Sequence, residues 1–133
     1  MEKKNEFNRL IHVSAREAIQ LINEGAYLVD VRPDYELGRL FDVENVIYCP
    51  YDEIAENLPE LPKDCNLIIA DAVGIQSKKI ASTLLSAGFS KICNLAGGIV
   101  DWDREGYPVT TDKTRIYNGP CMCQLKTRNK NTK

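Results

Sequence analysis

The chain has 133 residues, of which 44% are hydrophobic and 27% are charged, which is the size and composition of one globular domain. Its net charge of -2, with acidic and basic residues interspersed, argues against the basic face that binds duplex nucleic acid. The first residues lack an apolar secretion signal, and no apolar run approaches the roughly 20 residues that span a bilayer. We therefore expect a cytoplasmic protein with neither a membrane nor a nucleic-acid partner.

The first predicted helix begins at residue 15. Ser14 and Glu17 have the spacing of a capping box, apolar residues then recur at helical intervals, and Gly25 supplies a left-handed stop. Short, largely apolar and β-prone segments follow and predict strands at residues 26–31, 45–49, 66–70 and 91–95.

Helices are predicted between these strands, at residues 52–58, 77–86 and 99–104. The helix at 52–58 is expected to end before Pro59. Strands that are apolar along their whole length are typical of a parallel sheet covered on both faces. The alternation therefore predicts an α/β sandwich, with ligand sites beyond the carboxyl ends of the strands.

The five cysteines are an odd set in a chain without an export signal, so we expect thiols rather than a disulfide framework. Three of them lie in or next to apolar strands, where we expect them to be buried: Cys49, Cys65 and Cys93. Cys121 and Cys123 lie among basic residues near the end of the chain and are candidate reactive thiols, or part of a flexible end without a role. With a single histidine, His12, the sequence predicts no metal site.

Four motifs, taken in order, resemble the rhodanese-like domain family. They are LVDVR at 28–32, ELGRL at 36–40, the strand, loop and helix around Asp71, and NLAGGI at 94–99 followed by Trp102. The resemblance covers residues 11–109 and leaves residues 1–10 as an extension and residues 110–133 as a partly flexible tail. It implies a three-layer sandwich in which helices flank both faces of a parallel sheet of about five strands.

The resemblance also implies an active-site loop between the central strand and the next helix. In active members this loop begins with a cysteine, whose persulfide is held by inward-pointing amides and by a helix start. Here the matching residues are Asp71, Ala72, Val73, Gly74, Ile75 and Gln76, with Ser77 starting the helix. Asp71 therefore stands at the position of the family nucleophile, and Gly74 suits a turn that needs a positive φ.

Asp71 allows two interpretations. It is either an acid, base or nucleophile, or a carboxylate that accepts hydrogen bonds from the loop amides and keeps the loop in shape. An aspartate cannot carry sulfane sulfur, and Ala72, Val73 and Gln76 replace the polar or cationic residues that often help to bind anionic substrates. The loop is expected to curl at the start of the helix, beyond the strand at 66–70.

Three further charged residues are candidates for the mouth of the site: Asp30, Arg32 and Arg39. Asp30 and Arg32 are expected to form an exposed or edge ion pair of structural importance, or to position the loop. Arg39 falls where many family members have a histidine, and it either places a positive charge near the site or is a solvated surface residue.

We therefore expect a rhodanese-like domain without thiosulfate sulfurtransferase activity that acts as a binding or regulatory module. Its partner is expected to be a protein or a small anion of unknown identity, and no cofactor is expected. The alternative is a sulfurtransferase, or a sulfur or redox carrier, that uses Cys121 and Cys123.

Overall fold

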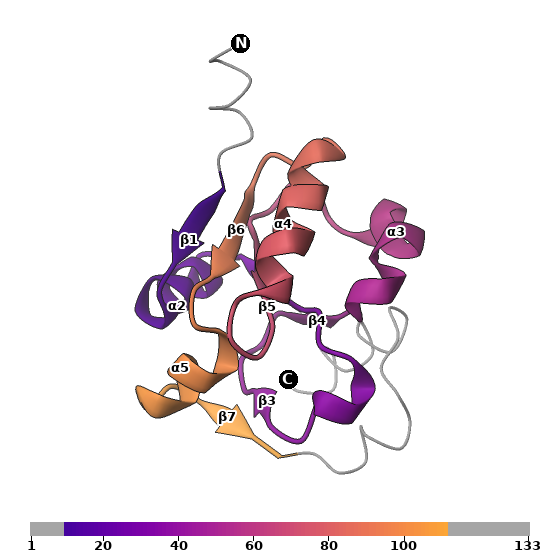
Figure 1. Ribbon diagram of the computed structural model, residues 1–133. Helices are drawn as coiled ribbons and strands as arrows, with labels where there is room; N and C mark the ends of the chain where they lie inside the picture. Colours follow the sequence, from indigo (N-terminus) through magenta and orange to yellow (C-terminus); the bar gives the residue numbers. More distant parts are fainter. Residues whose placement is uncertain (1–9, 112–133) are drawn as a thin grey trace.

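The computed structural model describes residues 10–111, whose centre is a parallel sheet of five strands in the order β1-β6-β5-β2-β4 (Figure 1). The strands are Ile11–Val13 (β1), Tyr27–Asp30 (β2), Val46–Tyr48 (β4), Leu67–Ala70 (β5) and Ile92–Leu95 (β6). All residues of β4, β5 and β6 are buried, as their apolar runs predict. The three residues of β1 are too few to show a period, and this strand was not among those expected from the sequence.

Helices cover both faces of the sheet, so the predicted three-layer sandwich is confirmed. The helices are Ala15–Asn23 (α2), Ile54–Asn57 (α3), Gln76–Ser86 (α4) and Gly98–Arg104 (α5). α4 packs against β5 and β6 on the near side in Figure 1, whereas α2 lies behind the sheet and contacts α5. None of the helices within residues 10–111 is long and apolar enough to cross a membrane.

The predicted capping box is present at the start of α2. The Ser14 hydroxyl accepts a hydrogen bond from the amide of Glu17 at 3.1 Å, and the Glu17 carboxylate accepts one from the amide of Ser14 at 2.9 Å. Gly25 has a φ of 109° and turns the chain from α2 into β2. The sequence therefore defines both ends of this helix.

The predicted helix at 52–58 is wrong in its length and regularity. The chain forms a 3₁₀ turn at Tyr51–Glu53 (η2), the single α-turn of α3, and a second 3₁₀ turn at Leu58–Glu60 (η3). Pro59 does not end the segment, because a proline in the first turn of a helix loses no hydrogen bond. α4 also begins one residue earlier than predicted, at Gln76.

A small antiparallel ribbon, absent from the predictions, joins the segment after β2 to the end of the domain. It pairs Leu40–Phe41 (β3) with Val109–Thr110 (β7). The buried Trp102 of α5 supports it, because its ring meets Phe41 edge to face at 5.1 Å and its indole N–H donates to the carbonyl of Pro108 at 2.7 Å. These contacts hold the segment after β2 close to α5.

Candidate functional site

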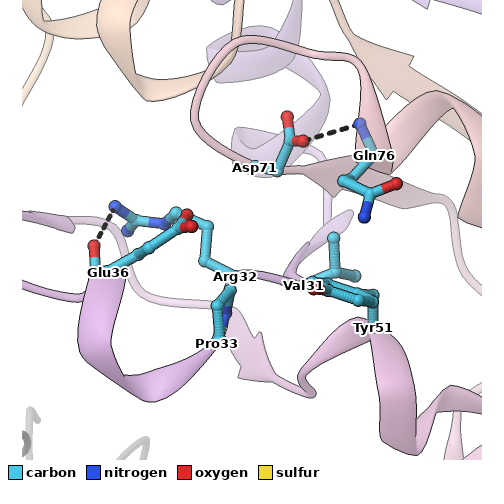
Figure 2. A pocket seen from close by; sticks show the side chains of 7 residues that line it. All are labelled: Val31, Arg32, Pro33, Glu36, Tyr51, Asp71 and Gln76. Atoms are coloured by element: carbon cyan, nitrogen blue, oxygen red, sulfur yellow. Dashed lines mark hydrogen bonds between the residues drawn. The ribbon is translucent and has the colours of Figure 1, made fainter.

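A cavity of about 100 Å³ lies at the carboxyl edge of the sheet. Its walls come from the segment after β2, from η2 after β4, and from the loop after β5 (Figure 2). The lining residues are Val31, Arg32, Pro33, Glu36, Tyr51, Asp71 and Gln76. This is the edge at which ligand sites of parallel α/β sheets form, because the connections from adjacent strands converge there.

The loop after β5 curls around the carboxylate of Asp71, as expected. Asp71 Oδ1 accepts from the amide of Gly74 at 2.5 Å, and Oδ2 accepts from the amides of Gln76 at 2.8 Å and Ser77 at 3.2 Å. The Ser77 hydroxyl also lies 3.2 Å from Oδ1. A carboxylate has about four lone-pair sites. Three of these are therefore taken by backbone amides, and the hydroxyl lies at the fourth.

Two glycines allow the loop to take this shape. Gly74 has a φ of 94°, as predicted, and a Cβ there would lie 3.0 Å from the amide nitrogen of Gly97. A Cβ on Gly98 would lie 2.3 Å from the carbonyl oxygen of Ala72. The close approach lets the first amides of α5 cap the loop, because Ile99 donates to the Asp71 carbonyl at 2.9 Å and Val100 to that of Ala72 at 3.1 Å.

A buried polar chain continues from the loop to the edge of the sheet, and the sequence interpretation did not identify it. The Ser77 hydroxyl donates to Asn94 Oδ1 at 2.5 Å, and the Asn94 amide nitrogen lies 3.1 Å from His12 Nδ1 and 3.5 Å from the Gly74 carbonyl. Asn94 is a buried polar residue in the otherwise apolar strand β6. That contrast in the sequence was the available signal, because buried amides almost always have hydrogen-bond partners.

Asp30 and Arg32 form an ion pair that is buried rather than exposed, which corrects the expectation of an exposed or edge pair. Their exposed fractions are 1% and 4%. Arg32 Nε and Nη2 donate to the two carboxylate oxygens at 3.0 and 2.8 Å, and its guanidinium also donates to the carbonyls of Glu36 and Arg39. Burial acts to lower the pKa of Arg32, but its hydrogen bond and charge interaction with Asp30 outweigh burial and raise this pKa. The arginine therefore carries a paired charge that fixes the chain after β2 in place.

Only Arg32 of the three candidate mouth charges lines the cavity. Asp30 is buried in its pair with Arg32 and does not line the cavity. The side chain of Arg39 forms an exposed ion pair with Asp103 near the end of α5. Arg39 is therefore the predicted solvated surface residue, and only its backbone carbonyl contributes to the site, by accepting from Arg32.

None of the three cysteines among the described residues lines the cavity. Cys49 and Cys93 are buried as expected, whereas Cys65 is only half-buried, because it lies in the turn before β5 rather than in the strand. Burial raises the pKa of Cys49, and it raises that of Cys93 to about 11, so both are protonated at neutral pH. Cys121 and Cys123 lie outside the described residues.

The cavity offers a ligand a carboxylate, an amide that can donate and accept, and an aromatic ring with a hydroxyl group. Glu36, Tyr51 and Gln76 line it, the Asp71 carboxylate is engaged by the loop, and the positive charge of Arg32 is paired with Asp30. In residues 10–111, no three His, Cys, Asp or Glu side chains are grouped so that they could hold a metal ion.

Comparisons with known proteins identify the fold and the family. The rhodanese-like domain model matches residues 14–105. The chain is 30% identical over 86 residues to a sulfurtransferase of Allochromatium vinosum, a match that covers 65% of this chain and 79% of the relative. It is 33% identical over 106 residues to the uncharacterized protein YibN of Escherichia coli K12, a match that covers 76% of this chain and 73% of the relative. The crystal structure of a rhodanese-related protein from Thermoplasma volcanium superposes with a TM-score of 0.69 at 28% identity, covering 77% of this chain and 99% of the other. The chain belongs to the rhodanese-like domain family.

Proposed function

We propose that this chain is a rhodanese-like binding module that does not transfer sulfur from thiosulfate. The observation that carries the proposal is the carboxylate of Asp71, which accepts hydrogen bonds from the loop amides of Gly74, Gln76 and Ser77. By the resemblance in sequence, this is the place in which active members hold a cysteine persulfide. A resident carboxylate fills that place with a negative charge and leaves the loop closed.

The chemistry of sulfur transfer supports the same proposal. In the thiosulfate reaction a cysteine thiolate takes the outer sulfur, sulfite leaves, and the persulfide then gives that sulfur to cyanide as thiocyanate. An oxygen of Asp71 cannot form an equivalent persulfide. Because backbone amides of the loop occupy three of its lone-pair sites, the carboxylate is also a poor general base.

Charge around the cavity disfavours an anionic donor such as thiosulfate. Residues 33–36, 51–53 and 71–77 contain five acidic residues and no lysine or arginine. Arg32 is the one cation among the lining residues, and Asp30 neutralises its charge. A doubly charged anion would therefore meet like charges at the mouth, where such repulsion costs binding energy.

The test is an assay of thiocyanate formation from thiosulfate and cyanide by the full chain. We expect no turnover above the rate without protein, and we expect Asp71→Cys to restore little, because the mouth still lacks unpaired cations. A bacterial rhodanese with an active-site cysteine serves as the positive control. Turnover by wild type that survives replacement of both Cys121 and Cys123 by serine would contradict the proposal.

The same assay, combined with labelling, tests the alternative that the chain is a sulfur carrier that uses Cys121 and Cys123. Persulfide labelling followed by peptide mapping identifies any cysteine that holds sulfur. Wild-type turnover that disappears in the Cys121→Ser, Cys123→Ser variant, with label on the peptide containing both residues, would favour the carrier.

A further inference from the structure

Most of the exposed large hydrophobic side chains belong to segments that build or adjoin the cavity, and one of them, Tyr51, lines it. Within residues 10–111 the exposed large hydrophobic residues are Ile11, Tyr35, Tyr51, Val73, Ile75 and Val100. All but Ile11 belong to the segments that build the site: η1 (Asp34–Glu36), η2, the Asp71 loop, and the start of α5, which is bonded to that loop. Ile75 is 62% exposed, although Ser77, two residues later in α4, is fully buried. Apolar groups concentrated at one end of a monomer mark an interaction surface.

The same segments carry negative charge. Four acidic residues on the segments that flank the cavity are at least partly exposed: Asp34 and Glu36 on η1, and Asp52 and Glu53 on η2. After the Asp71 loop, the first basic residues along the chain are Lys78 and Lys79 of α4. The described residues as a whole hold eight lysines and arginines against sixteen aspartates and glutamates, which gives them a net charge of -8. A partner that complements this end of the molecule is therefore positively charged.

The volume of the cavity indicates what enters it. Sites for small molecules usually enclose about 300 Å³ or more. The space here is about 100 Å³, which suits one side chain better than a whole ligand. Its lining provides a carboxylate at Glu36, an amide at Gln76 and an aromatic ring at Tyr51, and these are the groups that receive a lysine or arginine side chain.

We propose that this acidic, apolar mouth docks a basic segment of a partner protein, with one lysine or arginine side chain in the cavity and neighbouring apolar side chains on Tyr51, Val73 and Ile75. The inference rests on the proposed function and deepens it by naming the class of partner. Asp71 keeps the loop in the shape that forms one wall, and the Asp30–Arg32 pair fixes the opposite wall.

Fluorescence anisotropy with the full chain and a short labelled peptide of lysine, leucine and alanine tests this docking. The control peptide has glutamate in place of lysine. The site variants are Glu36→Lys and Ile75→Ser. The matched controls are Glu24→Lys and Ile11→Ser, which change the same residue types at the amino edge of the sheet. Circular dichroism checks folding, and Glu53→Lys replaces Glu36→Lys if the latter does not fold.

We expect the basic peptide to bind and the acidic peptide not to bind. Glu36→Lys should raise Kd by about tenfold or more, whereas Glu24→Lys should change it by less than about twofold. Added salt should weaken binding of the basic peptide. No binding of this peptide, or equal losses in Glu24→Lys and Glu36→Lys, would overturn the inference.

A further variant separates an external partner from the basic end of this chain. In this variant alanine replaces the basic residues near the end of the chain, which are Lys126, Arg128, Lys130 and Lys133. If the variant binds the peptide about tenfold more tightly or better, the chain's own basic segment competes for the mouth, and the inference of an external partner is overturned. The thiocyanate assay is independent of these results. An inactive protein that binds no basic peptide would remove the docking inference alone, whereas wild-type sulfur transfer would remove the proposed function.

Discussion

Asp71 caps α4 from outside the helix. Ile75, at the usual cap position, has no side-chain acceptor, and the first two amides of α4, those of Gln76 and Ser77, donate to Asp71 instead. The carboxylate also places a negative charge at the positive end of the helix dipole. One residue therefore satisfies the helix start and closes the loop.

Replacing Asp71 by alanine should lower the free energy of unfolding by about 1–2 kcal/mol, because amides that now have a partner would lose it. Urea unfolding of both proteins measures the difference. Asp42→Ala, at an exposed aspartate outside the loop, is the control and should change stability by less than about 0.5 kcal/mol. Equal stability of Asp71→Ala and wild type would mean that water replaces the carboxylate without loss.

Cys93 should make the protein less stable at high pH. Its pKa is raised by burial from 9.0 to about 11 in the folded state, so the unfolded chain loses the thiol proton first as pH rises. The stabilisation that comes from the neutral thiol is complete below 9.0 and is lost progressively as pH rises toward 11. Urea unfolding at about pH 8 and about pH 10 should show a smaller loss in Cys93→Ala than in wild type. Identical losses would contradict burial of this thiol as the cause.

At the scale of elements, the start of α5 supports the loop through backbone contacts. Gly98 lies so close to the loop that a Cβ would fall 2.3 Å from the Ala72 carbonyl oxygen and 2.5 Å from that of Asp71. The amides of Ile99 and Val100 bind these same two carbonyls. The loop is therefore held between two helix starts, α4 on its carboxylate and α5 on its backbone.

Gly98→Ala should push α5 away from the loop and destabilise the protein by about 3 kcal/mol or more. The added Cβ would meet the backbone of the loop rather than a flexible side chain, and neither the loop nor α5 can move aside without losing hydrogen bonds. Gly38→Ala is a matched control, because no atom lies within 4 Å of a Cβ there and its φ is not in the left-handed region. We expect that variant to be neutral or slightly stabilising. Thermal melts compare the two, and similar melting temperatures for both variants would show that α5 does not press on the loop.

The sequence predicts those elements whose cause is local. The capping box of α2 and the apolar runs of β2, β4, β5 and β6 carry their own signals, and each element forms where expected. The β3–β7 ribbon carries no such signal, because its strands are two residues long and Phe41 pairs with Val109, 68 positions later in the chain. Its stability comes from the packing of Trp102 and Phe41, which no local pattern reveals.

At the scale of the whole molecule, the site is an assembly of the carboxyl ends of three strands. The motif around Asp71 could be located from the sequence, but the wall formed by Tyr51 and Glu36 depends on the order β5-β2-β4 within the sheet. Burial of the Asp30–Arg32 pair has the same origin, because Asp30 lies between Tyr48 of β4 and Ala70 of β5 and Arg32 donates to the carbonyl of Glu36. Side chains that come together through strand order have no shared spacing in the sequence.

The arrangement predicts how the whole molecule responds to anions. In wild type the Asp71 carboxylate occupies the ring of amides, and the mouth beside it is acidic, so sulfate should raise the melting temperature little. In Asp71→Ala the same amides of Gly74, Gln76 and Ser77 face the open cavity. Sulfate should bind there and recover part of the lost stability, because a ligand that binds only the folded state stabilises it by mass action.

Thermal melts of both proteins over a sulfate series measure this response, with a chloride series matched in ionic strength to remove general screening. Asp42→Ala shows what loss of one negative charge outside the loop does to the sulfate response. A larger sulfate response in Asp71→Ala than in both other proteins is the expected result. An equal response in all three would mean that the amides of the loop do not form an anion cradle, and that the Asp71 carboxylate is not its resident ligand.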